Sequence, residues 1–368
     1  MAATQSTDRF IPLVEPWIDD SCASEVRAQV ASGFLGPGKT TERFAAGLCE
    51  LLEAPSCILT TSGTVALTVA AHACGLRPGD EVLVPAYGVV STINGFASAG
   101  LRPRLVEIDR RTGCIDPNVL AREISQATKA ICFVNFSGYT GSNLDAVVGL
   151  ASERRIPLIE DAATAIGHRH AGRSAGTFGT TGTLSFSPPK TVTTGQGGAV
   201  VTSSPELRDA AAAYVDHGDL SWRQTNLNRD VGTNLRFNDV LSALGLAQLR
   251  NLDERLARKR RAYAALRELL GDRIFSVPGD EAPLFNIVFS AEAQRLADEL
   301  RRRGIGAVRQ YRTISQHPAY AHLAGPFPAS DWWTDCAVYL PFGLALTEDE
   351  ATRIARAVLK TGIELVVP

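Results

Sequence analysis

Apolar residues of this chain form short buried runs that alternate with segments of helical spacing. Runs of four or five residues, rich in β-branched side chains, predict strands at 57–61, 81–84, 104–108, 130–134 and 156–159. Between them, the segments 65–74, 118–126 and 144–154 predict helices. Because strands and helices alternate, the sequence predicts an α/β fold with a mostly parallel central sheet flanked by helices.

The second half of the chain has a different organisation. Residues 240–269 carry apolar side chains at helical spacing with many Arg and Lys between them, which predicts one long amphipathic helix with a solvated polar side. A strand at 284–289 and helices at 291–303 and 348–360 then predict a smaller α+β region. We therefore expect a large domain over residues 1–250, including an N-terminal segment, and a small C-terminal α+β domain over residues 251–368.

Composition narrows the class of protein. The 368 residues have a formal charge of −2, which gives no reason to expect nucleic acid or an anionic membrane as a partner. No run of 18 uncharged apolar residues occurs, and the first nine residues are too polar for a secretion signal. The seven cysteines include no C-x-x-C pair, so we expect reduced thiols, no metal site and a cytoplasmic protein.

One segment matches a phosphate-binding motif. Residues 33–40, GFLGPGKT, fit the pattern G-x-x-x-x-G-K-[ST] of P-loop ATPases. That loop must follow a buried strand and open a helix, so that backbone N–H groups meet the phosphates. The preceding residues 19–32 have helical spacing instead. An ATPase is therefore the weaker alternative.

A lysine and an aspartate lie at candidate ligand-binding positions. Lys190 follows two prolines on a constrained loop between two apolar strands, where it is either a solvated loop residue or a reactive amine that forms a Schiff base. Asp161 follows the apolar run that ends at Ile159, at the carboxyl end of a predicted buried strand. Open α/β sheets place their ligands at such strand ends.

A second candidate site opens the helix at 65–74. The preceding residues Ser62, Gly63 and Thr64 follow a predicted strand. A helix N-terminus offers free N–H groups and a partial positive charge to an anion, although the same residues also make an ordinary N-cap.

The acid, the lysine loop and the Ser-Gly-Thr turn together resemble the DegT/DnrJ/EryC1/StrS family of pyridoxal-phosphate (PLP) sugar aminotransferases, over residues 34–346. The resemblance implies the fold type I of PLP-dependent transferases and PLP as cofactor. It implies that Lys190 forms the Schiff base and acts as the general acid–base catalyst, and that Asp161 is the partner of the pyridine nitrogen. It also assigns phosphate contacts to Gly63, Thr64 and Ser185.

Three further positions carry over from the family. Val89 stands where the family has an aromatic ring stacked on the cofactor, and forgoes about 0.5–1.5 kcal/mol of an aromatic pair. Tyr87, two residues earlier, is an open candidate to replace that ring. Thr164 stands where glutamine or histidine often contacts the ring hydroxyl, and Asn234 where an asparagine reaches the neighbouring subunit's phosphate. The resemblance thus implies a homodimer with shared active sites.

The resemblance implies transfer of an amino group from glutamate or glutamine to a keto-sugar, most commonly nucleotide-linked, or to a keto-cyclitol. The setting is sugar or natural-product biosynthesis. A related sugar dehydratase branch has histidine at the lysine position, so Lys190 argues against it. An atypical or non-catalytic relative stays open because of Val89 and Thr164.

Overall fold

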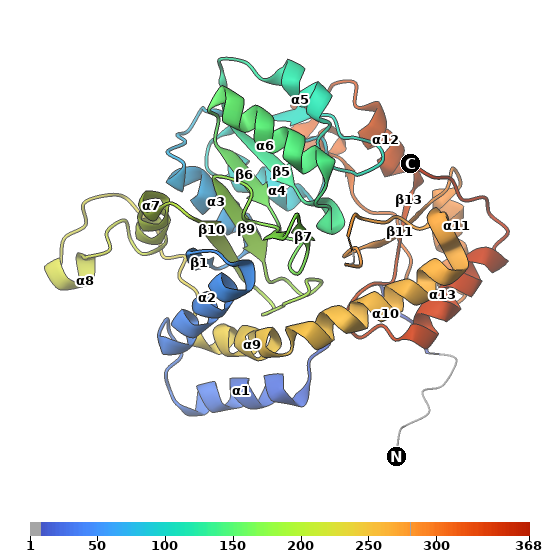
Figure 1. Ribbon diagram of the computed structural model, residues 1–368, viewed down its shortest axis with the longest axis horizontal. Coiled ribbons are helices and arrows are strands. Elements are labelled where there is room, and N and C mark those ends of the chain that lie inside the picture. The colour runs from blue at the N-terminus through green and yellow to red at the C-terminus, as the bar shows by residue number, and fades with distance from the viewer. Residues whose placement is uncertain (1–8, 280) are drawn as a thin grey trace.

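A seven-stranded sheet forms the centre of the larger part of the molecule (Figure 1). The computed structural model describes residues 9–279 and 281–368. The strands of this sheet are β1 (Ser56–Thr60), β2 (Glu81–Pro85), β4 (Arg102–Val106), β5 (Thr128–Val134), β6 (Leu158–Asp161), β9 (Thr181–Ser185) and β10 (Gly198–Thr202). They lie in the order β1-β10-β9-β6-β5-β2-β4, parallel from β9 to β4, with β10 antiparallel to both neighbours. The predicted mostly parallel sheet is confirmed.

The sheet is buried on both faces by helices. The helices are α1 (Asp20–Ala31), α2 (Lys39–Leu52), α3 (Gly63–Ala73), α4 (Val90–Ala97), α5 (Pro117–Glu123), α6 (Ser142–Arg154), α7 (Pro205–Val215), α8 (Trp222–Thr225), α9 (Asp239–Arg250), α10 (Leu252–Leu270), α11 (Ala293–Arg302), α12 (Pro328–Cys336) and α13 (Glu348–Lys360). On β5, Phe133 lies in one apolar cluster with Leu144 of α6, whereas Cys132 lies in another with Phe96 of α4. Successive residues of a strand point to opposite faces, so the continuous apolar runs are those of strands covered on both sides.

The C-terminal part packs around its own small sheet. Strands β11 (Asn286–Phe289) and β13 (Ala337–Leu340) pair antiparallel, and α10 runs beside α13 (Figure 1). The remaining short elements are β3 (Tyr87–Gly88), β7 (Arg169–His170), β8 (Arg173–Ser174), β12 (Arg312–Thr313), η1 (Phe136–Gly138), η2 (Gly271–Arg273), η3 (Ile314–Gln316) and η4 (Pro318–Leu323). Because β12 pairs with β3, the C-terminal part reaches back to the carboxyl edge of the large sheet. The domain boundary at residue 250 stays a prediction.

The single long helix expected over residues 240–269 is wrong, because the chain forms two helices that meet at Asn251. Its backbone leaves the helical region (φ −104°, ψ 19°), and its side chain donates to Asp19 Oδ2 over 3.2 Å.

The polar side of the helix predicted over residues 240–269 is also not uniformly solvated. Arg255 is fully buried and donates to Thr191 O and Trp17 O, at 2.9 Å each. Contacts with distant segments, which local spacing does not encode, decide both differences.

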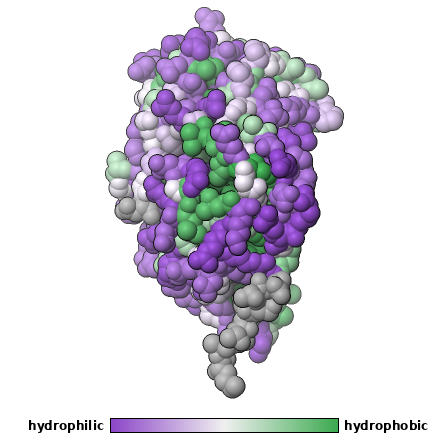
Figure 2. Space-filling model, turned by 90° about the vertical axis from the view of Figure 1, so that its right-hand side faces the viewer, coloured by the Kyte–Doolittle hydropathy of each residue, from purple (hydrophilic) through white to green (hydrophobic). Residues whose placement is uncertain are grey.

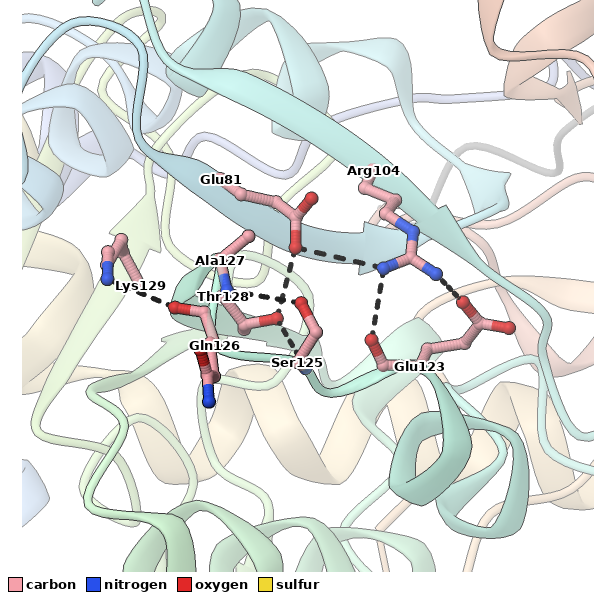
Figure 3. Close-up of polar contacts among 8 residues, drawn as sticks. All are labelled: Glu81, Arg104, Glu123, Ser125, Gln126, Ala127, Thr128 and Lys129. Atoms are coloured by element: carbon pink, nitrogen blue, oxygen red, sulfur yellow. Dashed lines mark hydrogen bonds and ion pairs between the residues drawn. The ribbon is translucent and has the colours of Figure 1, made fainter.

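Polar contacts tie the strands together at the amino end of the sheet (Figure 3). Arg104 on β4 forms an ion pair with Glu123 at the end of α5, and its Nη1 lies 3.8 Å from Glu81 Oε1. Thr128, the first residue of β5, donates to the same Glu81 oxygen over 3.0 Å. These contacts link β2, β4 and β5 at the edge opposite to their carboxyl ends.

Apolar residues are exposed on one face of the molecule, which is its right-hand side in the view of Figure 1. Figure 2 shows them gathered in the middle of that face, surrounded by polar residues. In the C-terminal part of the chain, Leu359 is 41% exposed and Val367 54%. Within the described ranges, no helix combines the length and apolar character needed to cross a membrane.

The segment 33–40 does not have the surroundings of a P-loop. Helix α1 precedes it, and the carboxylate of Asp239 occupies the start of α2. Asp239 Oδ1 accepts from Gly38 N over 2.9 Å, and from Thr41 N and Thr41 Oγ1 over 2.8 and 2.6 Å. Because this side chain takes the place where a phosphate would bind, the ATPase alternative loses its structural basis.

We expect Asp239→Ala to destabilise the protein by about 1–3 kcal/mol, because it removes the cap of α2 and leaves donors without an acceptor. Urea unfolding measures the change. Asp253→Ala, at an exposed position in the first turn of α10, is the control and should change stability by less than about 0.5 kcal/mol. Equal losses in the two variants would contradict this role for Asp239.

Candidate active site

A cavity of about 240 Å³ opens at the carboxyl end of the large sheet. Seven of the eight residues predicted from the sequence line it: Gly63, Thr64, Val89, Asp161, Thr164, Ser185 and Lys190. They come from four separate segments, around residues 63–64, 89, 161–164 and 185–190, which only the fold brings together. Its position at the strand ends is the one that open α/β sheets use for ligands.

Asp161 is a buried carboxylate held by two hydrogen bonds. It is the last residue of β6 and is 4% exposed. Thr92 Oγ1 donates to its Oδ2 over 2.7 Å, and Ala163 N donates to its Oδ1 over 3.1 Å. Burial raises the pKa of Asp161, whereas these hydrogen bonds and the charge of Lys190 act in the opposite direction. A cation placed beside this carboxylate would favour its ionised form.

Lys190 lies on the loop from β9 to β10 and faces the same cavity. Burial lowers the pKa of its amine to about 8, although the charge of Asp161 counteracts this. Among the residues that the structure describes, the amine has neither a hydrogen-bond partner nor an ion pair. A substantial fraction is therefore neutral near physiological pH and available as a nucleophile.

Helices α9 and α10 hold the lysine loop in place. Gln248 accepts from Thr193 N over 2.9 Å and donates to Thr193 O over 2.6 Å. Arg255 donates to Thr191 O over 2.9 Å. Since the loop backbone is bonded on its far side to buried side chains, Lys190 is fixed on the cavity side.

The start of α3 forms an anion cradle together with Ser185. Ser62 caps the helix by accepting from Val65 N over 3.2 Å, and Gly63 and Thr64 line the cavity. A Cβ atom at Gly63 would lie 2.7 Å from Ser185 Cβ, so only glycine allows this close approach. The N-terminus of this 11-residue helix and a hydroxyl thus meet at one spot.

The two departures from the family pattern both face the cavity. Val89 lines it, and Tyr87 does not replace the missing ring. The hydroxyl of Tyr87 lies 2.9 Å from that of Tyr339 in the core. Thr164 Oγ1 donates to Asn135 O over 2.6 Å, so toward a ligand this hydroxyl is left as an acceptor.

Asn234 lies outside the cavity. It is exposed, forms an isolated bridge with Asp216, and accepts from Arg236 Nε over 2.9 Å. Within one chain it does not meet the other predicted residues, and its contact with a second subunit stays a prediction.

Sequence reasoning missed several residues of the cavity. Thr92, which bonds Asp161, carries no motif that marks it. Phe285 and Tyr311 come from the C-terminal part of the chain, and neither was among the predicted site residues. Tyr311 has a φ of 37°, a left-handed conformation that is rare for a tyrosine and that tends to occur at functional sites. Only the tertiary structure reveals these residues.

A mostly parallel sheet with a buried acid and a low-pKa lysine at its carboxyl end defines an α/β enzyme with a lysine-centred site. The chain belongs to the DegT/DnrJ/EryC1/StrS aminotransferase family, whose sequence pattern matches residues 16–359.

Relatives within this family are aminotransferases of sugar and natural-product biosynthesis. The L-glutamine:2-deoxy-scyllo-inosose aminotransferase of Micromonospora echinospora is 36% identical over 256 residues, which cover 67% of this chain and 60% of that enzyme. The GDP-perosamine synthase of Vibrio cholerae is 28% identical over 367 residues, or 95% of this chain and 98% of that enzyme. Helicobacter pylori PseC, an aminotransferase involved in the biosynthesis of pseudoaminic acid, superposes with a TM-score of 0.89 at 25% identity, covering 96% of this chain and 99% of its own.

We expect Thr92→Val to lower the free energy of unfolding by about 1–3 kcal/mol, because a buried carboxylate loses a hydrogen-bond donor. Urea unfolding of the cofactor-free protein measures this loss. Thr92→Ser keeps the hydroxyl and should stay within about 1 kcal/mol of the unmodified protein. If the valine and serine variants were equally stable, the bond to Asp161 would not contribute as described.

Proposed function

We propose that this chain is a PLP-dependent aminotransferase that moves an amino group from glutamate or glutamine to a keto-sugar linked to a nucleotide, or to a keto-cyclitol. The observation that carries the proposal is the meeting of Lys190 and Asp161 in one cavity beside the anion cradle. Two of the relatives named above support the acceptor class. One has an inosose and glutamine in its name, and the other is a synthase of a nucleotide-linked amino sugar.

The residues present fit PLP. Its phosphate matches the cradle made by the start of α3 and Ser185, where the close approach of Gly63 leaves no room for a side chain. Asp161 offers a buried, hydrogen-bonded carboxylate to the pyridine nitrogen, and Lys190 would hold the cofactor covalently. Val89 would cover the ring by dispersion alone, and Thr164 would offer its oxygen as an acceptor to the ring hydroxyl.

Each side chain then has a defined task. When bound, PLP supplies an electron sink for the charge that develops at Cα of the amino donor. Asp161 keeps the pyridine nitrogen protonated through its negative charge. The Lys190 amine, whose pKa burial lowers to about 8, would take a proton from Cα of the donor in the first half of the transfer. In the second half, the same group would give a proton to the carbon of the acceptor that receives the amino group.

We further propose a cytoplasmic homodimer with shared active sites. Asn234 supports this arrangement, since it is exposed and lies outside the cavity of its own chain. In the dimer, its amide would donate to the phosphate held by the second copy.

We expect Lys190→Ala to lower transamination by at least about 10²–10⁴-fold, because the general acid–base group is lost. The absorbance of lysine-bound cofactor should disappear while the circular dichroism spectrum is retained. Lys129→Ala, at an exposed position on β5, is the matched control and should keep full activity. Turnover that survives Lys190→Ala would reject the assignment.

Covalent attachment of PLP to the cofactor-free protein should depend on pH through Lys190. Only the neutral amine reacts, so the rate should fall about tenfold for each pH unit below 8 and level off above it. Stopped-flow absorbance measures the rate. Lys259→Met removes another lysine whose pKa burial lowers to about 8, and the midpoint should stay in place. A midpoint near the ordinary value of lysine would contradict the role of burial at Lys190.

The acceptor is identified by offering keto-sugar nucleotides and keto-cyclitols to the pyridoxamine-loaded protein. Return of the aldehyde form of the cofactor reports transfer. Turnover of either class by the unmodified protein, and not by Lys190→Ala, supports the proposal. Failure with both classes in a protein that binds PLP would restrict it to an atypical relative.

A further inference from the structure

A second cavity, of about 350 Å³, adjoins the cavity of Lys190. Val89 and Tyr311 line both of them, so the two cavities share a wall. The second cavity lies where β3 pairs with β12, and the C-terminal part of the chain supplies most of its lining. A Cβ atom at Gly88 on β3 would meet no atom within 4 Å, so backbone borders open space there. The roles assigned above leave this second cavity without an occupant.

The lining of the second cavity is basic. It includes two arginines and a histidine, Arg309, Arg312 and His317, together with the neutral amides Gln294 and Gln310. None of the described residues that line it is an aspartate or a glutamate. A concave site lined by charges of one sign attracts a ligand of the opposite sign, so the chemistry of this cavity fits an anion.

The guanidinium of Arg309 is fixed at this cavity. Its Nη2 donates to Thr334 O over 2.9 Å and lies 3.6 Å from Asp335 Oδ1. Asp335 does not line the cavity, and its side chain is 75% exposed, so water screens this ion pair. Arg309 therefore still presents a positive charge and further N–H donors to a ligand.

Arg312 has no comparable partner. Its backbone pairs with Gly88, while among the described residues no hydrogen bond or ion pair engages its guanidinium. Asp331, on the neighbouring helix α12, is bonded instead by Thr313 Oγ1 over 2.6 Å and by Gln316 Nε2 over 3.0 Å. Since a guanidinium matches the oxygens of a phosphate with two parallel N–H groups, Arg312 is available to bind one.

We propose that the second cavity is a subsite for the acceptor, in which Arg309 and Arg312 bind the diphosphate of a nucleotide-linked keto-sugar. The inference rests on the proposed function and selects this acceptor over a keto-cyclitol, which carries no phosphate. The reacting carbonyl lies at Lys190, whereas the diphosphate is attached to a different carbon of the sugar ring. Val89 and Tyr311 would then flank the ring between its two ends.

The amino donor fits the second cavity less well. Its α-carboxylate is bonded to the carbon that reacts, and so stays in the cavity of Lys190. The side chain of glutamine is uncharged and gives two arginines nothing to neutralise. A diphosphate, which carries its charge away from the reacting carbon, matches the separation of the basic cavity from the lysine.

Binding of uridine, thymidine and guanosine diphosphates to the PLP-loaded protein, measured by calorimetry, tests the subsite. PLP occupies the anion cradle beforehand, so the probes report on the second cavity. We expect Arg312→Gln to weaken the diphosphate that binds most tightly by about tenfold or more, because a charged hydrogen bond to phosphate is lost. Arg312→Lys keeps the charge and should bind with intermediate affinity. Arg356→Gln, at an exposed position on α13 outside both cavities, is the matched control and should bind normally.

Kinetics separates the acceptor from the donor. Arg312→Gln should raise the KM of the keto-sugar nucleotide, while glutamate or glutamine should convert bound PLP into its pyridoxamine form at an unchanged rate. The proposal is overturned if none of the three diphosphates binds, or if Arg312→Gln binds them as tightly as the unmodified protein does. A rise confined to the KM of the amino donor would equally overturn it, since the arginine would then serve the donor.

Two steps are measured first, without any nucleotide: attachment of PLP, and its conversion by the amino donor. Failure of these steps would reject the proposed function, and the subsite with it. Failure of diphosphate binding in a protein that completes both steps would reject the subsite alone.

Discussion

A buried carboxylate and a partly buried amine share one small cavity, and the site depends on their mutual electrostatics. Burial alone would neutralise both groups, since it raises the pKa of Asp161 and lowers that of Lys190. Each also favours the charged form of the other. The hydrogen bond from Thr92 adds to the stability of the carboxylate. The result is an acid that can stay ionised beside an amine that loses its proton easily, which transfer of an amino group requires.

The scaffold that fixes this pair lies outside the cavity. Gln248 and Arg255 bind the backbone of the lysine loop from α9 and α10. The first residue of α9, Asp239, caps α2 at the same time. On the two sides of the break at Asn251, α9 packs beside α2 and α10 packs beside α13. One pair of helices thus connects the N-terminal segment, the lysine loop and the C-terminal part.

The walls of the cavity show how this chain departs from the pattern of its family. Val89 and Thr164 both line the cavity, while Tyr87 points into the core and bonds Tyr339. An aromatic side chain nevertheless borders the cavity, because Tyr311 reaches it from the C-terminal part. The cavity is therefore bordered by the aliphatic Val89 from one segment and by the aromatic Tyr311 from another.

Local patterns were enough to determine several features of this protein from its sequence. The apolar runs predicted the strands, and the position of Asp161 directly after one run predicted that it lies at the carboxyl end of a strand. The Ser-Gly-Thr turn predicted the start of α3. Each depends on neighbours along the chain, whose spacing the sequence states directly. Tertiary structure decided the rest: the bond from Thr92, the supports from Gln248 and Arg255, the break at Asn251 and the arrival of Tyr311. These contacts join segments far apart in the chain, and they exist only once the packing of the whole molecule has fixed which side chains meet.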